Sequence, residues 1–204
     1  MFQEAHVKLD LDETASVLDV VNEMVEGSLF DPLETTILAV DLPFYEGWRF
    51  LDIADHATSP PLQRYVFQKE DGFIMLDWSY RPIYVVNELA PVKIDEETVL
   101  DYVRFFFSHV RGKHGRFILC ESLENVNWKE EPPVTARKSF ADFIKPMEIL
   151  EMREDGVFKI DARMLLKDAL FKVNVYVEPS GRVTLTDHEV LIEDMPVLDH
   201  VFAQ

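Results

Sequence analysis

The chain has 204 residues, of which 48% are hydrophobic, so it is long and apolar enough to bury one substantial core. Its formal net charge of −18 repels phosphate backbones and anionic lipid headgroups, so we expect no nucleic-acid binding and no membrane association. The single cysteine, Cys120, excludes an intrachain disulfide and a cysteine-based zinc site. No stretch has the length of a membrane span and the N-terminus lacks signal-peptide features, so we expect a cytoplasmic protein.

The first part of the chain predicts one helix followed by strands. Leu18, Val21 and Met24 recur at helical spacing, and Gly27 stands where a C-terminal cap would end the helix. Turn-forming residues then separate five apolar runs that predict antiparallel strands: TTILAV (35–40), GWRFLDIA (47–54), LQRYVFQ (62–68), GFIMLDW (72–78) and IYVVNE (83–88). The pair Asp71-Gly72 predicts a tight hairpin turn between the third and fourth of these runs.

A second helix is predicted over residues 95–111. Asp95 can cap its N-terminus, and Gly112, flanked by basic residues that include His114, marks its end. At 100° per residue, one broad apolar face is suited to docking on a sheet: Val99, Leu100, Val103, Phe106, Phe107 and Val110.

Three further residues of this helix, Tyr102, Phe105 and His109, share another face at spacings of three and four. A helix that is apolar on more than half its circumference is buried on two sides. Three explanations stay open for this face: burial in the protein's own core with polar atoms bound to backbone, the lining of a ligand pocket, or a contact in a homodimer.

The C-terminal part predicts an antiparallel meander over residues 146–192, preceded by a helix that begins near Pro132-Pro133. Phe158, Ile160, Ala162 and Met164 alternate with Lys159, Asp161, Arg163 and Leu165, and Val173, Val175 and Val177 alternate with Lys172, Asn174 and Tyr176. One face is therefore apolar, and we expect the helix at 95–111 to cover it.

The fold class that these elements predict is α+β: a long curved antiparallel sheet, with strands from 36–88 added to the meander and helices packed on one face. We expect a single domain over residues 1–204, with a possible subdomain boundary near residue 92. In outline this resembles the cystatin-like and nuclear-transport-factor-like scaffolds, an analogy of architecture that carries no function.

Candidate chemistry is sparse. Asp-His pairs occur at 55–56, 187–188 and 199–200, but adjacent strand residues point to opposite faces, so no pair forms a dyad by itself. We expect His188 to share a solvated face with Thr184 and Thr186. Cys120, in an apolar run, is expected to be a buried thiol. No spacing indicates a metal site, a phosphate-binding loop, a cofactor or a nucleophile elbow, so we name no catalytic residue, metal ligand or cofactor.

The functional hypothesis is a non-catalytic binding or protein-interaction module, with an aromatic-lined pocket or an oligomer surface around the helix at 95–111. Tyr102, Phe105 and His109 are the candidate ligand or interface residues, and the partner would be a small apolar or aromatic ligand or a second copy of the chain. The alternative is a small enzyme that uses His109 or His56 with a carboxylate as an acid-base pair. A purely structural subunit would instead show a large, dry, self-complementary interface.

Overall fold

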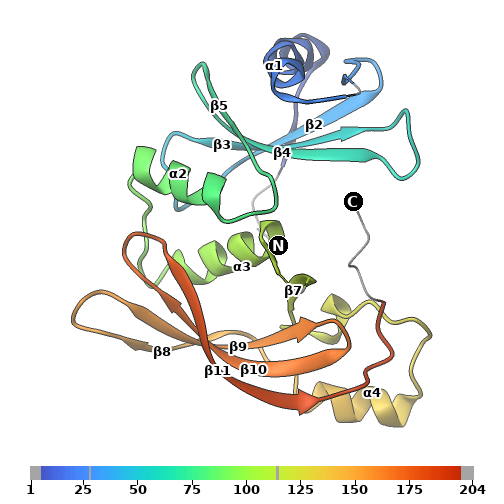
Figure 1. Ribbon diagram of the computed structural model, residues 1–204, viewed down its shortest axis with the longest axis vertical. Coiled ribbons are helices and arrows are strands. Elements are labelled where there is room, and N and C mark those ends of the chain that lie inside the picture. Colours follow the sequence, from blue (N-terminus) through green and yellow to red (C-terminus); the bar gives the residue numbers. More distant parts are fainter. Residues whose placement is uncertain (1–5, 28, 114, 199–204) are drawn as a thin grey trace. The chain divides into compact units, whose positions relative to one another are not determined.

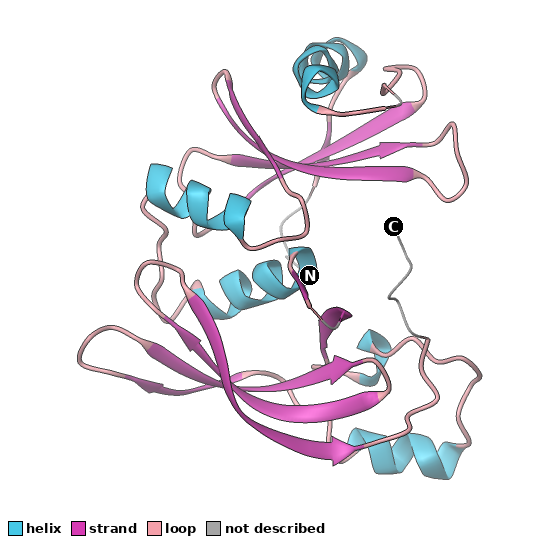
Figure 2. Ribbon diagram, in the orientation of Figure 1, coloured by secondary structure: helices cyan, strands magenta, loops and turns pink. Residues whose placement is uncertain are grey.

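The structure, a computed structural model, describes residues 6–27, 29–113 and 115–198 (Figures 1 and 2). The chain forms two compact units. The N-terminal unit runs up to Asp77 and also contains Arg81–Lys93, whereas the C-terminal unit contains Trp78–Tyr80 and the chain from Ile94 onward. The change of unit after Lys93 lies beside the boundary expected near residue 92, and the single-domain organisation stays a prediction.

The N-terminal unit is an antiparallel sheet with the strand order β1-β2-β3-β4-β5. Its elements are β1 (Val7–Lys8), α1 (Leu11–Met24), β2 (Thr35–Asp41), β3 (Arg49–Asp55), β4 (Leu62–Lys69), β5 (Gly72–Met75) and α2 (Arg81–Leu89). Asp10 caps α1 by accepting a hydrogen bond from the backbone N–H of Glu13 at 2.9 Å. The buried stripe of α1, which includes Leu18 and Val21, packs in one core with Ile37 and Ile53 of the sheet.

Three local expectations for this unit were wrong in detail. The run at 83–88, predicted as a strand, lies in α2, where Ile83 and Val86 are buried three residues apart and Pro82 occupies the first turn, which tolerates it. Helix α1 ends at Met24, before Gly27. The hairpin between β4 and β5 does form, but Lys69 pairs with Gly72, so its turn is Glu70-Asp71, one residue earlier than predicted.

The C-terminal unit is a second antiparallel sheet with the order β11-β10-β9-β7-β6, in which β8 also pairs with β9. Its elements are α3 (Val99–His109), β6 (Arg111–Gly112), β7 (Gly115–Leu119), the 3-10 turn η1 (Leu123–Asn125), α4 (Val134–Ala141), β8 (Glu148–Met152), β9 (Phe158–Leu166), β10 (Ala169–Val177) and β11 (Val183–Ile192). The α+β class and the C-terminal meander are thus confirmed. The strands from 35–75, however, form a sheet of their own and do not join the meander.

The two faces of the C-terminal sheet differ as the alternation predicts. On the inner face Ile160 pairs with Val175 and Ala162 with Val173, and all four are buried. Figure 1 shows α3 over this face. The hydroxyl of Tyr102 on α3 donates a hydrogen bond of 2.6 Å to the carbonyl of Gly181, at the turn before β11.

The outer face of the same sheet changes character along the strands. At one end Leu165 pairs with Leu170, and both are buried in an apolar cluster with the segment around α4. Within that cluster Trp128 stacks on Phe140 of α4, with ring centroids 5.1 Å apart. Toward the other end the outward side chains are charged or polar, and they form the candidate site. Within the described residues no helix could cross a lipid bilayer.

Candidate functional site

The structure buries all three candidate residues of α3. Tyr102 and Phe105 have no exposed surface, and His109 is 8% exposed. The Tyr102 hydroxyl is bound to Gly181, while Phe105 and His109 contact each other, with ring centroids 4.5 Å apart. A polar atom buried in a core needs a hydrogen-bond partner, and backbone carbonyls supply one for Tyr102 and one for His109. A ligand pocket or a subunit contact at these residues stays a prediction.

His109 is held as a neutral ring. Its Nδ1 lies 2.8 Å from the carbonyl oxygen of Phe105, one helical turn earlier, and because a carbonyl only accepts, Nδ1 carries the proton. Burial lowers the pKa of His109 to about 4, although the bond to Phe105 favours the charged form, and the positive charge of Arg116 lowers this pKa further.

The other histidines of interest lie on open surface. His56 is exposed directly after β3, and its backbone N–H donates to the carbonyl of Glu34. The neighbouring Asp55 uses its carboxylate to accept from the backbone of Ala57 at 2.8 Å. His188 is exposed on β11, and the pair at 199–200 lies outside the described residues. Among the described residues no group of His, Cys, Asp and Glu is arranged to hold a metal ion.

Cys120 is a buried thiol, as expected. It has no exposed surface and its desolvation raises the pKa to about 12. A thiol with a raised pKa stays protonated at neutral pH, so it behaves as a small apolar side chain.

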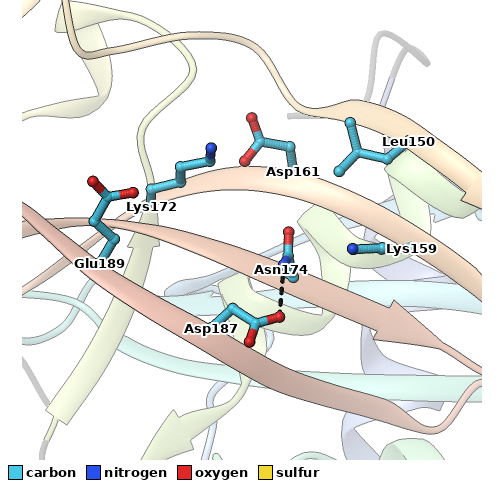
Figure 3. A pocket seen from close by; sticks show the side chains of 7 residues that line it. All are labelled: Leu150, Lys159, Asp161, Lys172, Asn174, Asp187 and Glu189. Carbon is cyan, nitrogen blue, oxygen red and sulfur yellow. Dashed lines mark hydrogen bonds between the residues drawn. The ribbon is translucent and has the colours of Figure 1, made fainter.

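A charged hollow of about 320 Å³ lies on the outer face of the C-terminal sheet. Figure 3 shows its lining, which comes from four adjacent strands: Leu150 of β8, Lys159 and Asp161 of β9, Lys172 and Asn174 of β10, and Asp187 and Glu189 of β11. Lys172 pairs across the strands with Glu189, and Asn174 pairs with Asp161. The sheet register therefore brings two ammonium groups and three carboxylates to one concave surface.

A β-bulge shapes the β11 side of the hollow. Lys172 pairs with Glu189 and Asn174 pairs with Thr186, so two residues of β11 oppose the single residue between Lys172 and Asn174. One of these two is Asp187, whose φ of 54° lies in the left-handed region that non-glycine residues seldom adopt. The bulge shifts the strand period, so Glu189, rather than His188, lines the hollow with Asp187.

Two hydrogen bonds fix the carboxylate of Asp187. Its Oδ2 accepts from the Asn174 side-chain amide at 2.8 Å and from the Thr186 hydroxyl at 3.0 Å. These bonds, that of Asn174 first, lower the pKa of Asp187, so the group is ionised at neutral pH. The bulge thus presents an oriented anion to the hollow (Figure 3).

The other charges of the hollow differ in how firmly they are held. Asp161 forms a 2.8 Å ion pair with Arg163, whose side chain is buried and also donates to the carbonyl of Phe143. In the part of the chain that the structure describes, the ion pairs do not include Lys159 or Lys172. Figure 3 draws Lys172 between Glu189 and Asp161. Lys159 does contact an aromatic ring, because its ammonium nitrogen lies 6.0 Å from the ring centroid of Tyr176. Neither lysine is held by an ion pair, so each can still pair with an anionic ligand.

A separate ion-pair network anchors α3 within its own unit. Arg104 binds both carboxylate oxygens of Glu121, at 2.7 and 2.8 Å, and also contacts Asp101 at 2.7 Å. Arg104 thus joins a carboxylate of its own helix to one on the segment that follows β7. The Arg104 guanidinium lowers the pKa of Glu121 through this hydrogen bonding. These groups satisfy one another and need no ligand.

Comparison with known proteins found no matching family model, no matching curated protein and no matching solved structure. The likeness in outline to cystatin-like and nuclear-transport-factor-like scaffolds accordingly stays a prediction.

Proposed function

We propose that this chain is a non-catalytic binding module and that it binds its ligand in the charged hollow on the outer face of the C-terminal sheet. The observation that carries the proposal is the presence, in one concavity, of an oriented carboxylate and two ammonium groups that form no ion pair within the described residues. Ligand sites commonly combine a concave surface with a few convergent polar groups, and backbone strain such as that at Asp187 is typical of functional positions.

This proposal keeps the functional class expected from the sequence but moves the site. Tyr102, Phe105 and His109 are buried, and the bonds of Tyr102 and His109 to backbone carbonyls fit a role in packing. The alternative of an enzyme with an acid-base pair at His109 or His56 draws no support from the carbonyl partner of His109 Nδ1 or from the exposed position of His56. The charges of the hollow favour a ligand that carries both signs.

The test is an NMR titration of the isotope-labelled full chain with three probes: acetate, n-butylammonium and 6-aminohexanoate. We expect 6-aminohexanoate to shift backbone amide signals of β9, β10 and β11 around the hollow more than either singly charged probe does. Exposed ion pairs contribute little each, so the dissociation constant should be on the order of 1 mM, which this method detects.

Matched variants locate the binding. Lys172→Gln removes one ammonium group of the hollow and should weaken binding, whereas Lys167→Gln removes the same charge from the β9–β10 turn, outside the lining, and should not. Shifts that cluster on α3, or equal behaviour of the two variants, would refute the hollow as the binding site.

A further inference from the structure

The charges of the hollow are ordered along the strands. On β10, Lys172 lies two residues from Asn174, which holds the Asp187 carboxylate, and Asn174 lies two residues from Tyr176. Tyr176 pairs with Lys159 of β9. Measured along the strand axis, the hollow therefore presents the ammonium group of Lys172 on β10, then the carboxylate of Asp187 on the neighbouring β11, then the ammonium group of Lys159 on β9.

Along the strand axis, the spacing of these groups matches that of alternate side chains on an extended chain. Strands rise about 3.3 Å per residue, so the four residues from Lys172 to the Lys159 row span about 13 Å, with Asp187 near the middle. Alternate residues of an extended peptide project from one face about 7 Å apart, so its positions i, i+2 and i+4 span the same length.

We propose that the hollow binds an extended peptide segment whose side chains follow the pattern acidic-x-basic-x-acidic. This rests on the proposed function and deepens it. The first and last side chains pair with Lys172 and Lys159, and the central cation pairs with Asp187, beside Glu189 on the same strand. Asp161 is already bound to Arg163, so it does not compete for the central cation.

Two features of the site favour a peptide over a small zwitterion. Three ion pairs exceed what a ligand with two charges can form, and each exposed pair is weak, so a third one matters. Leu150, at a bulge of β8 and 50% exposed, adds an apolar wall beside Lys159 that an intervening peptide side chain can contact.

The experiment compares three synthetic peptides by NMR titration of the full chain at low salt. The first is Ac-Ser-Glu-Ser-Lys-Ser-Glu-Ser-NH2, the second has the same composition with Glu-Glu-Lys contiguous, and the third exchanges every Glu and Lys of the first. We expect the alternating peptide to bind about fivefold more tightly than the contiguous peptide of equal net charge, which is the scale of one to two exposed ion pairs. The exchanged peptide has the opposite net charge, so its comparison is made at a salt concentration that screens the protein's net charge of −18, where it should bind less tightly than the alternating peptide. Added salt should weaken this binding.

A double-mutant cycle tests the central contact. Asp187→Asn removes the charge but keeps a residue that tolerates the left-handed backbone. This variant should bind the alternating peptide more weakly than the wild type does, yet bind a peptide in which Gln replaces the central Lys about as tightly. Lys159→Gln and Lys172→Gln should each weaken binding of the alternating peptide, and the melting temperature of each variant shows that it is folded.

The outcomes separate this inference from the proposed function. Preference for the alternating peptide, with coupling to Asp187, supports both. If 6-aminohexanoate shifts the hollow but the three peptides bind equally, or none binds, the peptide inference is overturned and the binding function stands. If no probe shifts the hollow, both are overturned.

Discussion

His109 shows how burial decides the state of a single side chain. An imidazole in water has a pKa near 6.5, and here its desolvation lowers that pKa to about 4. In the unfolded chain His109 therefore becomes protonated as the pH falls below 6.5. In the folded protein it becomes protonated only near pH 4. The stability from this group is fully present above pH 6.5 and is lost as the pH falls toward 4.

We expect the His109→Gln variant to lack this pH dependence. Between pH 7 and pH 5 the wild-type free energy of unfolding should fall by about 2 kcal/mol more than that of the variant. Glutamine can still donate to the Phe105 carbonyl, so the variant should fold. Urea denaturation of both proteins at the two pH values measures the difference, and parallel pH profiles would contradict a neutral, buried His109.

Phe105 allows a direct test of burial at the aromatic helix. The ring has no exposed surface, so Phe105→Ala should lower the free energy of unfolding by about 3 kcal/mol or more through lost contacts and a cavity. Phe143, which is 41% exposed, offers the same deletion at the surface, and Phe143→Ala should cost clearly less. Thermal and urea melts of the two variants decide the point, and equal losses would argue against a buried Phe105.

At the scale of elements, the β4–β5 hairpin carries strain that a substitution can remove. Glu70, the first turn residue, has a φ of 50°, a conformation that costs most side chains about 1 kcal/mol but that asparagine tolerates. Glu70→Asn should therefore raise the free energy of unfolding by about 0.5–1 kcal/mol. Asp71→Asn, at the next turn position, which has no positive φ, is the control and should change little.

Local patterns predicted most elements because each depends on neighbours in sequence. The alternation in β9 and β10 correctly predicted which side chains lie on the inner face and which on the outer face. It therefore placed four residues of the charged hollow on the outer face: Lys159, Asp161, Lys172 and Asn174. The run at 83–88 failed because a short apolar run fits a buried helix as well as a strand. The expectation of one continuous sheet was wrong, because strand pairing is non-local and the sequence holds no local signal for the division into two sheets.

The bulge in β11 explains why the rest of the hollow was missed. A strict period of two put His188 on the face of Thr184 and Thr186, whereas the extra residue moves Glu189 to the hollow and turns Asp187 toward Asn174. Aspartate tolerates the left-handed backbone better than most residues, which is a weak hint in the sequence. Its position opposite Asn174 depends on the register between two strands.

At the scale of the whole molecule, net charge determines which polymers the chain can approach. Charges of both signs meet in the hollow, but the formal net charge of −18 dominates at a distance, because contributions from separate charges add in the long-range field. Salt shortens the range of that field to about 10 Å at 0.1 M. A ligand of the hollow therefore binds through local charge complementarity, whereas the long-range field repels a strongly anionic polymer.

We therefore expect no binding to double-stranded DNA or RNA at micromolar protein concentration, even at low salt, where attraction to phosphates would be strongest. A gel-shift titration in 20 mM buffer measures this. Lys159→Glu/Lys172→Glu lowers the charge further and should behave like the wild type, because two lysines do not outweigh the surrounding carboxylates. A retarded band that disappears as salt is added would show that a basic surface overcomes the net charge, and would contradict the prediction.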